Sequence, residues 1–314
     1  MTDPAVAIIV FNRPDTVRQL LARLAVLRPK TLFVIGDGAR PHKSGEAALV
    51  SSVRTMISDV SWPCEVVTDY ASENLGCRRR VVSGLNWLFR QVDEAVILED
   101  DCLPTPSFMA YAGELLDRFR HDSRIGSVCG SLSVPSIPPV EGDYFFSRYN
   151  LFTGWATWRR AWSLYDDDME PVVDGSLDRI LAATFEQQRA RYYWRYVLRR
   201  THSGLINSWG YRWMLSCWAN SMMAAFPRCT LVDNVGFGDD ATNTRGQAWY
   251  FRQVLGELHM PLTHPRYVCR DAAIDRLVED ARYSKSVAGR LRWAIERLGY
   301  GTRIDHTNKS PTIR

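Results

Sequence analysis

The sequence lacks the long apolar run that a membrane-spanning helix requires. Such a helix needs about 20 consecutive apolar residues, whereas the first apolar run, AVAIIVF (5–11), stops at the polar sequence NRPD. No charged segment or cleavage site accompanies this run, so no signal peptide is expected. Together, these absences predict a cytoplasmic protein.

Cysteine spacing and net charge exclude further classes. The seven cysteines form no CxxC pair and no Cys/His ladder, which argues against a structural zinc site and favours reduced thiols. The net charge of +4 is too small to indicate nucleic acid as the main partner. Internal repeats and long linkers are also absent, so we expect one catalytic domain with C-terminal elaborations.

The first hundred residues alternate strand-like apolar runs with segments of helical periodicity. Helices are expected over 15–27, 45–58 and within 73–92, with Asp15 as a candidate cap for the first. The strand-like runs are AVAIIVF (5–11), TLFVIGD (31–37), CEVVTDY (64–70) and EAVILEDDC (94–102). This alternation predicts an α/β fold, in which helices flank a mostly parallel sheet and ligands bind at the carboxyl ends of its strands.

The pattern changes after residue 102. A helix is expected over 106–122, a proline-rich loop over 131–143, and a strand followed by a Gly/Asp-rich loop over 229–246. Two basic amphipathic helices, 189–200 and 285–299, fit peripheral contact with the inner, anionic face of a membrane. Solvated basic faces are the alternative interpretation of both helices.

The strongest chemical signal is the acidic end of the fourth strand. Glu99, Asp100 and Asp101 follow the apolar run AVIL. Adjacent carboxylates repel one another unless a cation lies among them. Mg²⁺ or Mn²⁺ is suited to one or two carboxylates together with phosphate oxygens. The pattern therefore predicts a divalent-metal site rather than a solvated acidic turn.

Polar residues also follow the earlier strands. Asn12 and Arg13 end the first strand, and Asp37 ends the second, where its carboxylate could accept an N–H from a base. Asn74 and Gly76 precede Arg78 to Arg80 at the start of a helix, whose N-terminus favours phosphate. Each feature alone is typical of an ordinary turn, but their joint position before an acidic strand end indicates a nucleotide site.

These segments resemble a known family. FNRPDTVRQLL, VIGDGARP, ENLGCRRRVVSGLNWLF, VILEDDCLP and GWATWRRAW look like bacterial glycosyltransferase family-two-like proteins, some of them labelled hemolysin-like. The order of the segments is also similar to that of N-acetylglucosaminyltransferase I. The resemblance covers roughly residues 5–270 and implies a GT-A (Rossmann-like) fold, a nucleoside-diphosphate-sugar donor and Mn²⁺ or Mg²⁺ as cofactor.

The resemblance also implies roles for single residues. Asp101 would be the direct metal ligand. Glu99 and Asp100 would lie near the ribose or the donor sugar, and Arg13 and Asp37 would contact the nucleotide. The full set of candidate nucleotide-sugar-binding residues is Phe11, Asn12, Arg13, Asp37, Gly38, Asn74, Arg78, Glu99, Asp100 and Trp155.

Two departures from the family fall in the expected site. Relatives carry an acid, the expected general base, between two tryptophans, where this chain has Gly210 in WGYRW (209–213). Relatives often have histidine at the position of Asn243. Asp239 and Asp240 are the nearest acids that could replace the missing base, although a turn-forming Gly/Asp loop accounts for them equally well.

Three side chains have both a functional and a packing interpretation. Trp155 or Trp158 could stack on a sugar, and ordinary packing is the alternative. His264 could be a further metal ligand or a structural histidine.

Taken together, the residues and the resemblance predict a metal-dependent glycosyltransferase of polysaccharide biosynthesis. It would transfer a sugar from a nucleoside-diphosphate-sugar to a hydroxyl of a glycan or lipid-linked glycan, with inversion. Residues 1–270 would form the GT-A domain, and 271–314 a basic helical extension. One rival is a sugar nucleotidyltransferase, which would normally carry a Gly-rich basic loop near the first strand. The other is a non-catalytic or weakened relative that binds a nucleotide sugar or glycan, which Gly210 favours.

Overall fold

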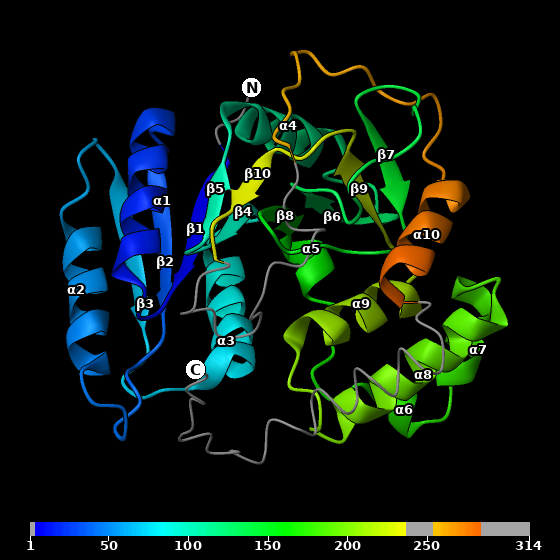
Figure 1. Cartoon of the computed structure of the whole chain (residues 1–314), viewed down its shortest axis with the longest axis horizontal. Coiled ribbons are helices and arrows are strands. Elements are labelled where there is room, and N and C mark those ends of the chain that lie inside the picture. The colour runs from blue at the N-terminus through cyan, green and yellow to red at the C-terminus, as the bar shows by residue number, and fades with distance from the viewer. Residues whose placement is uncertain (1–3, 237–253, 284–314) are drawn as a thin grey trace, which may run out of the picture.

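The computed structural model describes residues 4–236 and 254–283 of the chain. Within them, eight strands form one mixed sheet in the order β3-β2-β1-β4-β8-β6-β9-β7 (Figure 1). These strands are β1 (Ala5–Val10), β2 (Thr31–Gly36), β3 (Glu65–Tyr70), β4 (Glu94–Glu99), β6 (Ile125–Cys129), β7 (Tyr144–Ser147), β8 (Trp155–Trp158) and β9 (Met223–Pro227). A small separate sheet pairs β5 (Cys102–Pro104) with β10 (Val232–Asn234).

Helices connect and cover these strands. In the described ranges they are α1 (Pro14–Leu27), α2 (Glu46–Ser58), α3 (Gly76–Gln91), α4 (Pro106–Arg118), α5 (Arg159–Trp162), α6 (Glu170–Val173), α7 (Leu177–Thr184), α8 (Gln188–His202), α9 (Trp209–Ala219), α10 (Ala272–Val278) and the π-helical turn η2 (Glu279–Tyr283). The predicted helices of the first half and the basic helix α8 are therefore confirmed to within a few residues.

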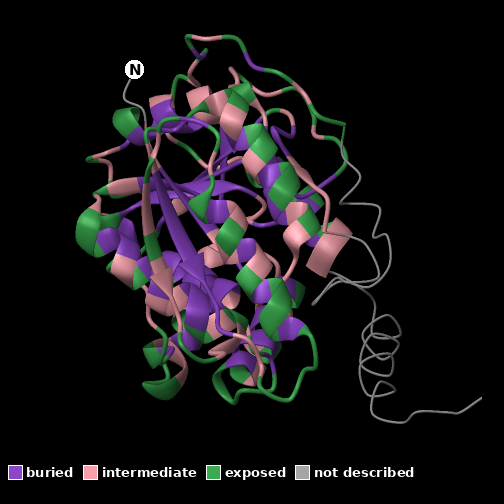
Figure 2. Cartoon of the chain, turned by 90° about the vertical axis from the view of Figure 1, so that its left-hand side faces the viewer, coloured by how far each residue is buried: buried purple, intermediate pink, exposed green. Residues whose placement is uncertain are grey.

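The first half of the sheet has the predicted parallel, Rossmann-like arrangement. Strands β3, β2, β1 and β4 are mutually parallel. Successive side chains of a strand point to opposite faces, and both faces are buried here. Val6 and Ile8 of β1 pack with α1, α2 and α4, whereas Ala7 packs with α3, α5 and α9. Figure 2 shows the sheet as the buried centre of the molecule. The predicted α/β class, a sheet flanked by helices, is confirmed.

Two local predictions were wrong. The single strand expected over 94–102 breaks after Glu99, and a turn at Asp100 and Asp101 separates β4 from β5. Asp15 does not cap α1. The helix begins at Pro14, whose fixed φ suits a first helical position, and Asp15 instead pairs with Arg18 one turn later.

The second half of the sheet contains antiparallel strands that the sequence pattern did not reveal. β8 runs antiparallel to both β4 and β6, and β7 runs antiparallel to β9. Helices α7 to α10 cover one face of this half, and α4 packs on the other. The buried carboxylate of Asp275 in α10 accepts hydrogen bonds from Ser147 and from Arg148, which lies next to β7. A domain boundary between residues 270 and 271 stays a prediction.

No helix of the described residues is long and apolar enough to cross a lipid bilayer. The predicted basic helix 285–299 lies outside the described residues. The other predicted basic helix is α8, on which Tyr192 and Tyr196 are exposed beside the guanidinium groups of Arg195 and Arg200.

Candidate functional site

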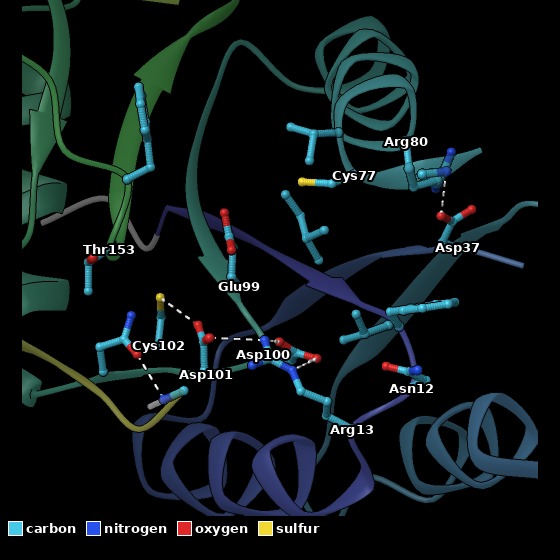
Figure 3. Close-up of a pocket in the computed structure, with 18 of the residues that line it drawn as sticks. Asn12, Arg13, Asp37, Cys77, Arg80, Glu99, Asp100, Asp101, Cys102 and Thr153 are labelled. Carbon is cyan, nitrogen blue, oxygen red and sulfur yellow. Dashed lines mark hydrogen bonds and ion pairs between the residues drawn. The ribbon is translucent and has the colours of Figure 1, made fainter. Parts of the chain in front are cut away.

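A pocket opens at the carboxyl ends of β1, β2 and β4, the edge of the sheet at which the sequence predicts a ligand (Figure 3). Its cavity of about 390 Å³ lies within the range of small-molecule sites. The lining residues come from segments far apart in the sequence. They include Phe11, Asn12, Arg13, Asp37, Arg40, Asn74, Cys77, Arg80, Glu99, Asp100, Asp101, Phe152, Thr153, Asn234 and Gly236.

The acidic strand end lies in the middle of this pocket. Glu99 is the last residue of β4, and Asp100 and Asp101 form the turn into β5. Figure 3 shows all three at the pocket, with the Glu99 side chain directed into it. The Glu99 carboxylate has no hydrogen-bond partner among the described residues, which leaves it available to a ligand.

Arg13 lies between the other two acids. Its Nη2 donates to Asp101 Oδ2 at 2.9 Å and to Asp100 Oδ1, and its Nε donates to Asp100 Oδ2 at 3.2 Å. Burial opposes the guanidinium charge, but Asp100 and Asp101 outweigh that effect and hold the pKa of Arg13 above its ordinary value. The Arg13 guanidinium therefore supplies the positive charge that these mutually repelling carboxylates require. In residues 4–236 and 254–283, no group of three or more His, Cys, Asp or Glu side chains is arranged as a metal site.

Removal from water shifts the pKa values of two of the acids. Burial, followed by the charges of Asp101 and Asp100, raises the pKa of Glu99 to about 8, against a smaller opposing effect of Arg13. Burial also raises the pKa of Asp100 to about 6, although the Arg13 guanidinium favours its ionised form. The raised pKa favours the protonated form of Glu99, which can donate a hydrogen bond to a ligand oxygen.

Glu99→Gln is expected to flatten the pH dependence of folding stability. A carboxyl group whose pKa is higher in the folded state stabilises the fold most below its unfolded pKa, about 4.3 for glutamate, and this contribution is lost as pH rises towards about 8. Wild type should therefore lose more stability than Glu99→Gln between pH 5 and pH 8.5. Urea denaturation at both pH values measures the difference, and parallel losses in the two proteins would refute the assignment.

The structure corrects the role of Asp37. This buried carboxylate accepts hydrogen bonds at Oδ1 from the backbone N–H groups of Gly38 and Leu75, both at 2.9 Å. Its Oδ2 accepts from the backbone of Gly76 at 3.0 Å and from Asn74 Nδ2 at 3.1 Å. A carboxylate has about four acceptor sites, so none is left for a base. Asp37 instead fastens the end of β2 to the start of α3.

Asp37→Asn should therefore reduce stability more than it changes nucleotide contacts. An amide can accept at one end only, so its NH₂ group would face two donors that Asp37 now satisfies. A buried donor without a partner costs about 1–3 kcal/mol. Chemical denaturation is the measurement, with the exposed Asp59→Asn as control. Equal free energies of unfolding for Asp37→Asn and wild type would contradict the fastening role.

A second polar network shapes the end of the pocket beside β1. Glu46, the first residue of α2, accepts hydrogen bonds from Asn12 Nδ2 at 2.9 Å and from the backbone and side chain of Arg40. The Arg40 hydrogen bonds lower the pKa of Glu46 to about 2 and keep its charge. The Arg40 guanidinium lies 5.6 Å from the centre of the Phe11 ring. This end of the pocket thus presents an aromatic ring, an amide and a guanidinium.

Arg78 and Arg80, near the start of α3, have different partners and positions. Arg78 donates to Asp167 and to Asn207 and does not line the pocket. Arg80 lines the pocket and donates to Asp69. Side chains two residues apart on a helix point in nearly opposite directions. Contrary to the prediction, Arg78 does not line the pocket, whereas Arg80 does.

The stacking prediction for the tryptophans was also wrong. Trp155 and Trp158 are each only 1% exposed. The Trp155 ring packs against Trp209 and Trp213, with centroid separations of 5.7 and 6.4 Å. No face of either ring is free for a sugar. Phe152, three residues before Trp155, is the aromatic residue that lines the pocket on this side.

Other candidates lie beside the pocket, away from it or outside the described residues. Gly38 supports the loop, because a Cβ there would approach the carbonyl carbon of Glu73 to 2.4 Å. His264 lies in a cluster with Glu114 and Tyr144 and is no pocket residue. The predicted base candidates Asp239 and Asp240, and the departure at Asn243, fall outside the described residues.

Sequence reasoning missed several pocket residues. Arg40 follows the second predicted strand closely, within the segment VIGDGARP, and could have been found from its charge. Phe152 and Thr153 could not, because they reach the pocket through β8. That strand runs antiparallel to β4 and pairs with it as far as Ile97 and Trp155, which brings the residues just before β8 to the carboxyl end of β4.

Comparison with known proteins gives distant structural likenesses. No family model matches the chain, and no curated protein matches it in sequence. A mannosyltransferase from Pyrobaculum calidifontis, in complex with GDP-Man and Mn²⁺, has 11% sequence identity and a TM-score of 0.36, over 96% of this chain and 81% of that one. A UDP-glucose pyrophosphorylase complexed with UDP-glucose has 8% identity and a TM-score of 0.30, over 51% of this chain and 78% of that one. Similarity at this level assigns no activity to the chain.

Proposed function

We propose that this chain is a glycosyltransferase that uses a nucleoside-diphosphate-sugar and a divalent cation. The observation that carries the proposal is the acidic strand end, Glu99 to Asp101, in the middle of a pocket of about 390 Å³. On one side of the acids lie Phe11, Asn12 and Arg40, a combination suited to a nucleobase and ribose. On the other side lies Phe152, whose apolar ring suits a sugar.

The pocket residues fit a cation that arrives with its own phosphate ligands. Three carboxylates with one arginine do not form a complete protein cage for a metal, but Mg²⁺ and Mn²⁺ commonly take one or two carboxylates plus substrate phosphates. Asp101 would be the protein ligand, and Arg13 must move away from it. When bound, the cation would neutralise charge on the departing diphosphate.

The chain's own residues would hold the donor and move one proton. Phe11 and Arg40 would hold the nucleotide, and Glu99 would hydrogen-bond the donor sugar. An acceptor hydroxyl oxygen would form a bond to the anomeric carbon as the bond to the diphosphate oxygen breaks. A carboxylate would take the hydroxyl proton, and Asp239 and Asp240 remain our candidates. Attack opposite the leaving group would invert the anomeric centre.

The chain after β1 argues against the nucleotidyltransferase alternative. That class is expected to carry a Gly-rich basic loop there, whereas Phe11, Asn12 and Arg13 lead directly into Pro14 of α1. The acceptor, a glycan or lipid-linked glycan, and peripheral membrane contact through α8 belong to this proposal as predictions.

Thermal denaturation with a donor panel tests the proposal. UDP-glucose, GDP-mannose and their nucleoside diphosphates are added with and without Mn²⁺. A ligand at 100 times its Kd stabilises the folded state by about 2.7 kcal/mol. One nucleotide sugar and its nucleoside diphosphate should therefore raise the Tm, and raise it further with Mn²⁺. No shift with any nucleotide, with or without the cation, would refute donor binding.

A further inference from the structure

Two phenylalanine rings line the pocket on opposite sides of the acidic strand end. Phe11 follows β1, Phe152 precedes β8, and β4 lies between β1 and β8 in the sheet. The charged residues therefore occupy the middle of the pocket, with one ring on either side. A nucleoside-diphosphate-sugar has the same linear order, because its charged diphosphate separates the base from the sugar.

The Phe152 ring is held in place by two tryptophan rings. It lies 4.4 Å from the Trp209 ring and 5.5 Å from the Trp155 ring, measured between centroids. It also lies directly against Gly210, where a Cβ would approach Phe152 Cε2 to 2.6 Å. Any side chain at position 210 would displace the Phe152 ring. Glycine is a poor helix former, so this contact gives a physical reason for its presence in α9.

Hydrogen-bonding groups line the same pocket as this ring. β4 and β8 pair as far as Ile97 and Trp155, so the same edge carries Glu99, just beyond Ile97, and Thr153, just before Trp155. Gly154 makes the connection possible: its φ is +61°, and a Cβ there would meet Val232 at 2.6 Å. The pocket therefore presents a flat apolar ring, a hydroxyl and a carboxyl group at this edge of the sheet. A hexose presents a matching apolar face with hydroxyls at its edge.

We infer that Phe152 is the specificity-determining wall for the donor sugar, and that Gly210 is required so that the ring can occupy this position. The inference rests on the proposed function and deepens it. It also changes the meaning of Gly210, because the space that a side chain would need there is filled by a ring that lines the pocket.

Affinity differences between matched ligands test the inference. Titration calorimetry in Mn²⁺ compares UDP with UDP-glucose, and GDP with GDP-mannose, using whichever pair wild type binds. Phe152→Ala should weaken the nucleotide sugar roughly tenfold, the upper range for a lost aromatic contact, and leave the nucleoside diphosphate within about twofold. Phe152→Leu, which keeps an apolar side chain of similar size, should lose less. Gly210→Ala should reproduce the pattern of Phe152→Ala because it displaces the same ring.

Phe11→Ala is the matched control on the other side of the acids, and it should weaken both ligands of a pair equally. Tryptophan fluorescence gives a second readout, since Phe152 packs on Trp209: the nucleotide sugar, but not the nucleoside diphosphate, should change the emission. The inference is overturned if folded Phe152→Ala and Phe152→Leu weaken both ligands equally or neither. If wild type binds no nucleoside diphosphate, the proposed function itself fails, and this inference fails with it.

Discussion

Asp101→Asn is expected to abolish the Mn²⁺-dependent part of nucleoside diphosphate binding while the protein stays folded. Asp101 is the carboxylate at the turn after β4 that we assign to the cation. Loss of a supporting residue around a metal typically costs 10–100-fold in affinity, so loss of the ligand itself should cost roughly 100-fold or more. Calorimetric titration of the nucleoside diphosphate, with and without Mn²⁺, measures the effect.

The exposed Asp59→Asn is the control for this experiment, since it removes the same charge from a residue that does not line the pocket. It should bind as wild type does. Affinity that still rises with Mn²⁺ in Asp101→Asn, to the extent seen in wild type, would remove Asp101 from the metal site.

Arg13→Gln should change metal binding and nucleotide binding in opposite directions. Arg13 now pairs with Asp100 and Asp101 and so competes with any cation for them. Without it the carboxylates repel each other, and Mn²⁺ alone should bind at least about tenfold more tightly, equivalent to about 1.4 kcal/mol. The nucleoside diphosphate should bind more weakly, because a guanidinium that could pair with phosphate is lost.

Arg18→Gln provides the matched control, since Arg18 lies near the start of α1, the helix that follows Arg13, and is exposed. Mn²⁺ binding in the absence of nucleotide can be followed by the paramagnetic resonance signal of the free ion. Equal Mn²⁺ affinity in Arg13→Gln and wild type would show that Arg13 does not compete with the metal.

The position of the site could be predicted from local sequence because the first half of the fold is built from consecutive parallel units. In such a sheet the carboxyl ends of all strands meet at one edge. Asn12 and the acids Glu99 to Asp101 each follow an apolar run. Their positions after these runs were sufficient to predict that they lie at the same edge of the sheet. The alternation of strands and helices likewise specified the class of the fold.

The remaining features depend on contacts between distant segments. The Asp37 carboxylate accepts hydrogen bonds from the backbone N–H groups of Leu75 and Gly76. The local sequence around Asp37 does not reveal these partners. The tryptophan-rich segment GWATW fitted either sugar stacking or ordinary packing. The structure shows packing, because β8 is an internal strand of the sheet and both rings are buried. Phe152 reaches the pocket only because β8 pairs antiparallel with β4. Arg13 was expected to contact the nucleotide. The strand pattern places it at the pocket but does not reveal that its guanidinium pairs with the side chains of Asp100 and Asp101.

The most direct test of the proposed function is product analysis after incubation with a nucleotide sugar, Mn²⁺ and a panel of glycan acceptors. Wild type is predicted to release nucleoside diphosphate and to form a new glycosidic bond on one acceptor, whereas Asp101→Asn should do neither. Formation of nucleotide sugar and pyrophosphate from a nucleoside triphosphate and a sugar phosphate, with no release of nucleoside diphosphate from any donor, would contradict the proposal and identify a nucleotidyltransferase.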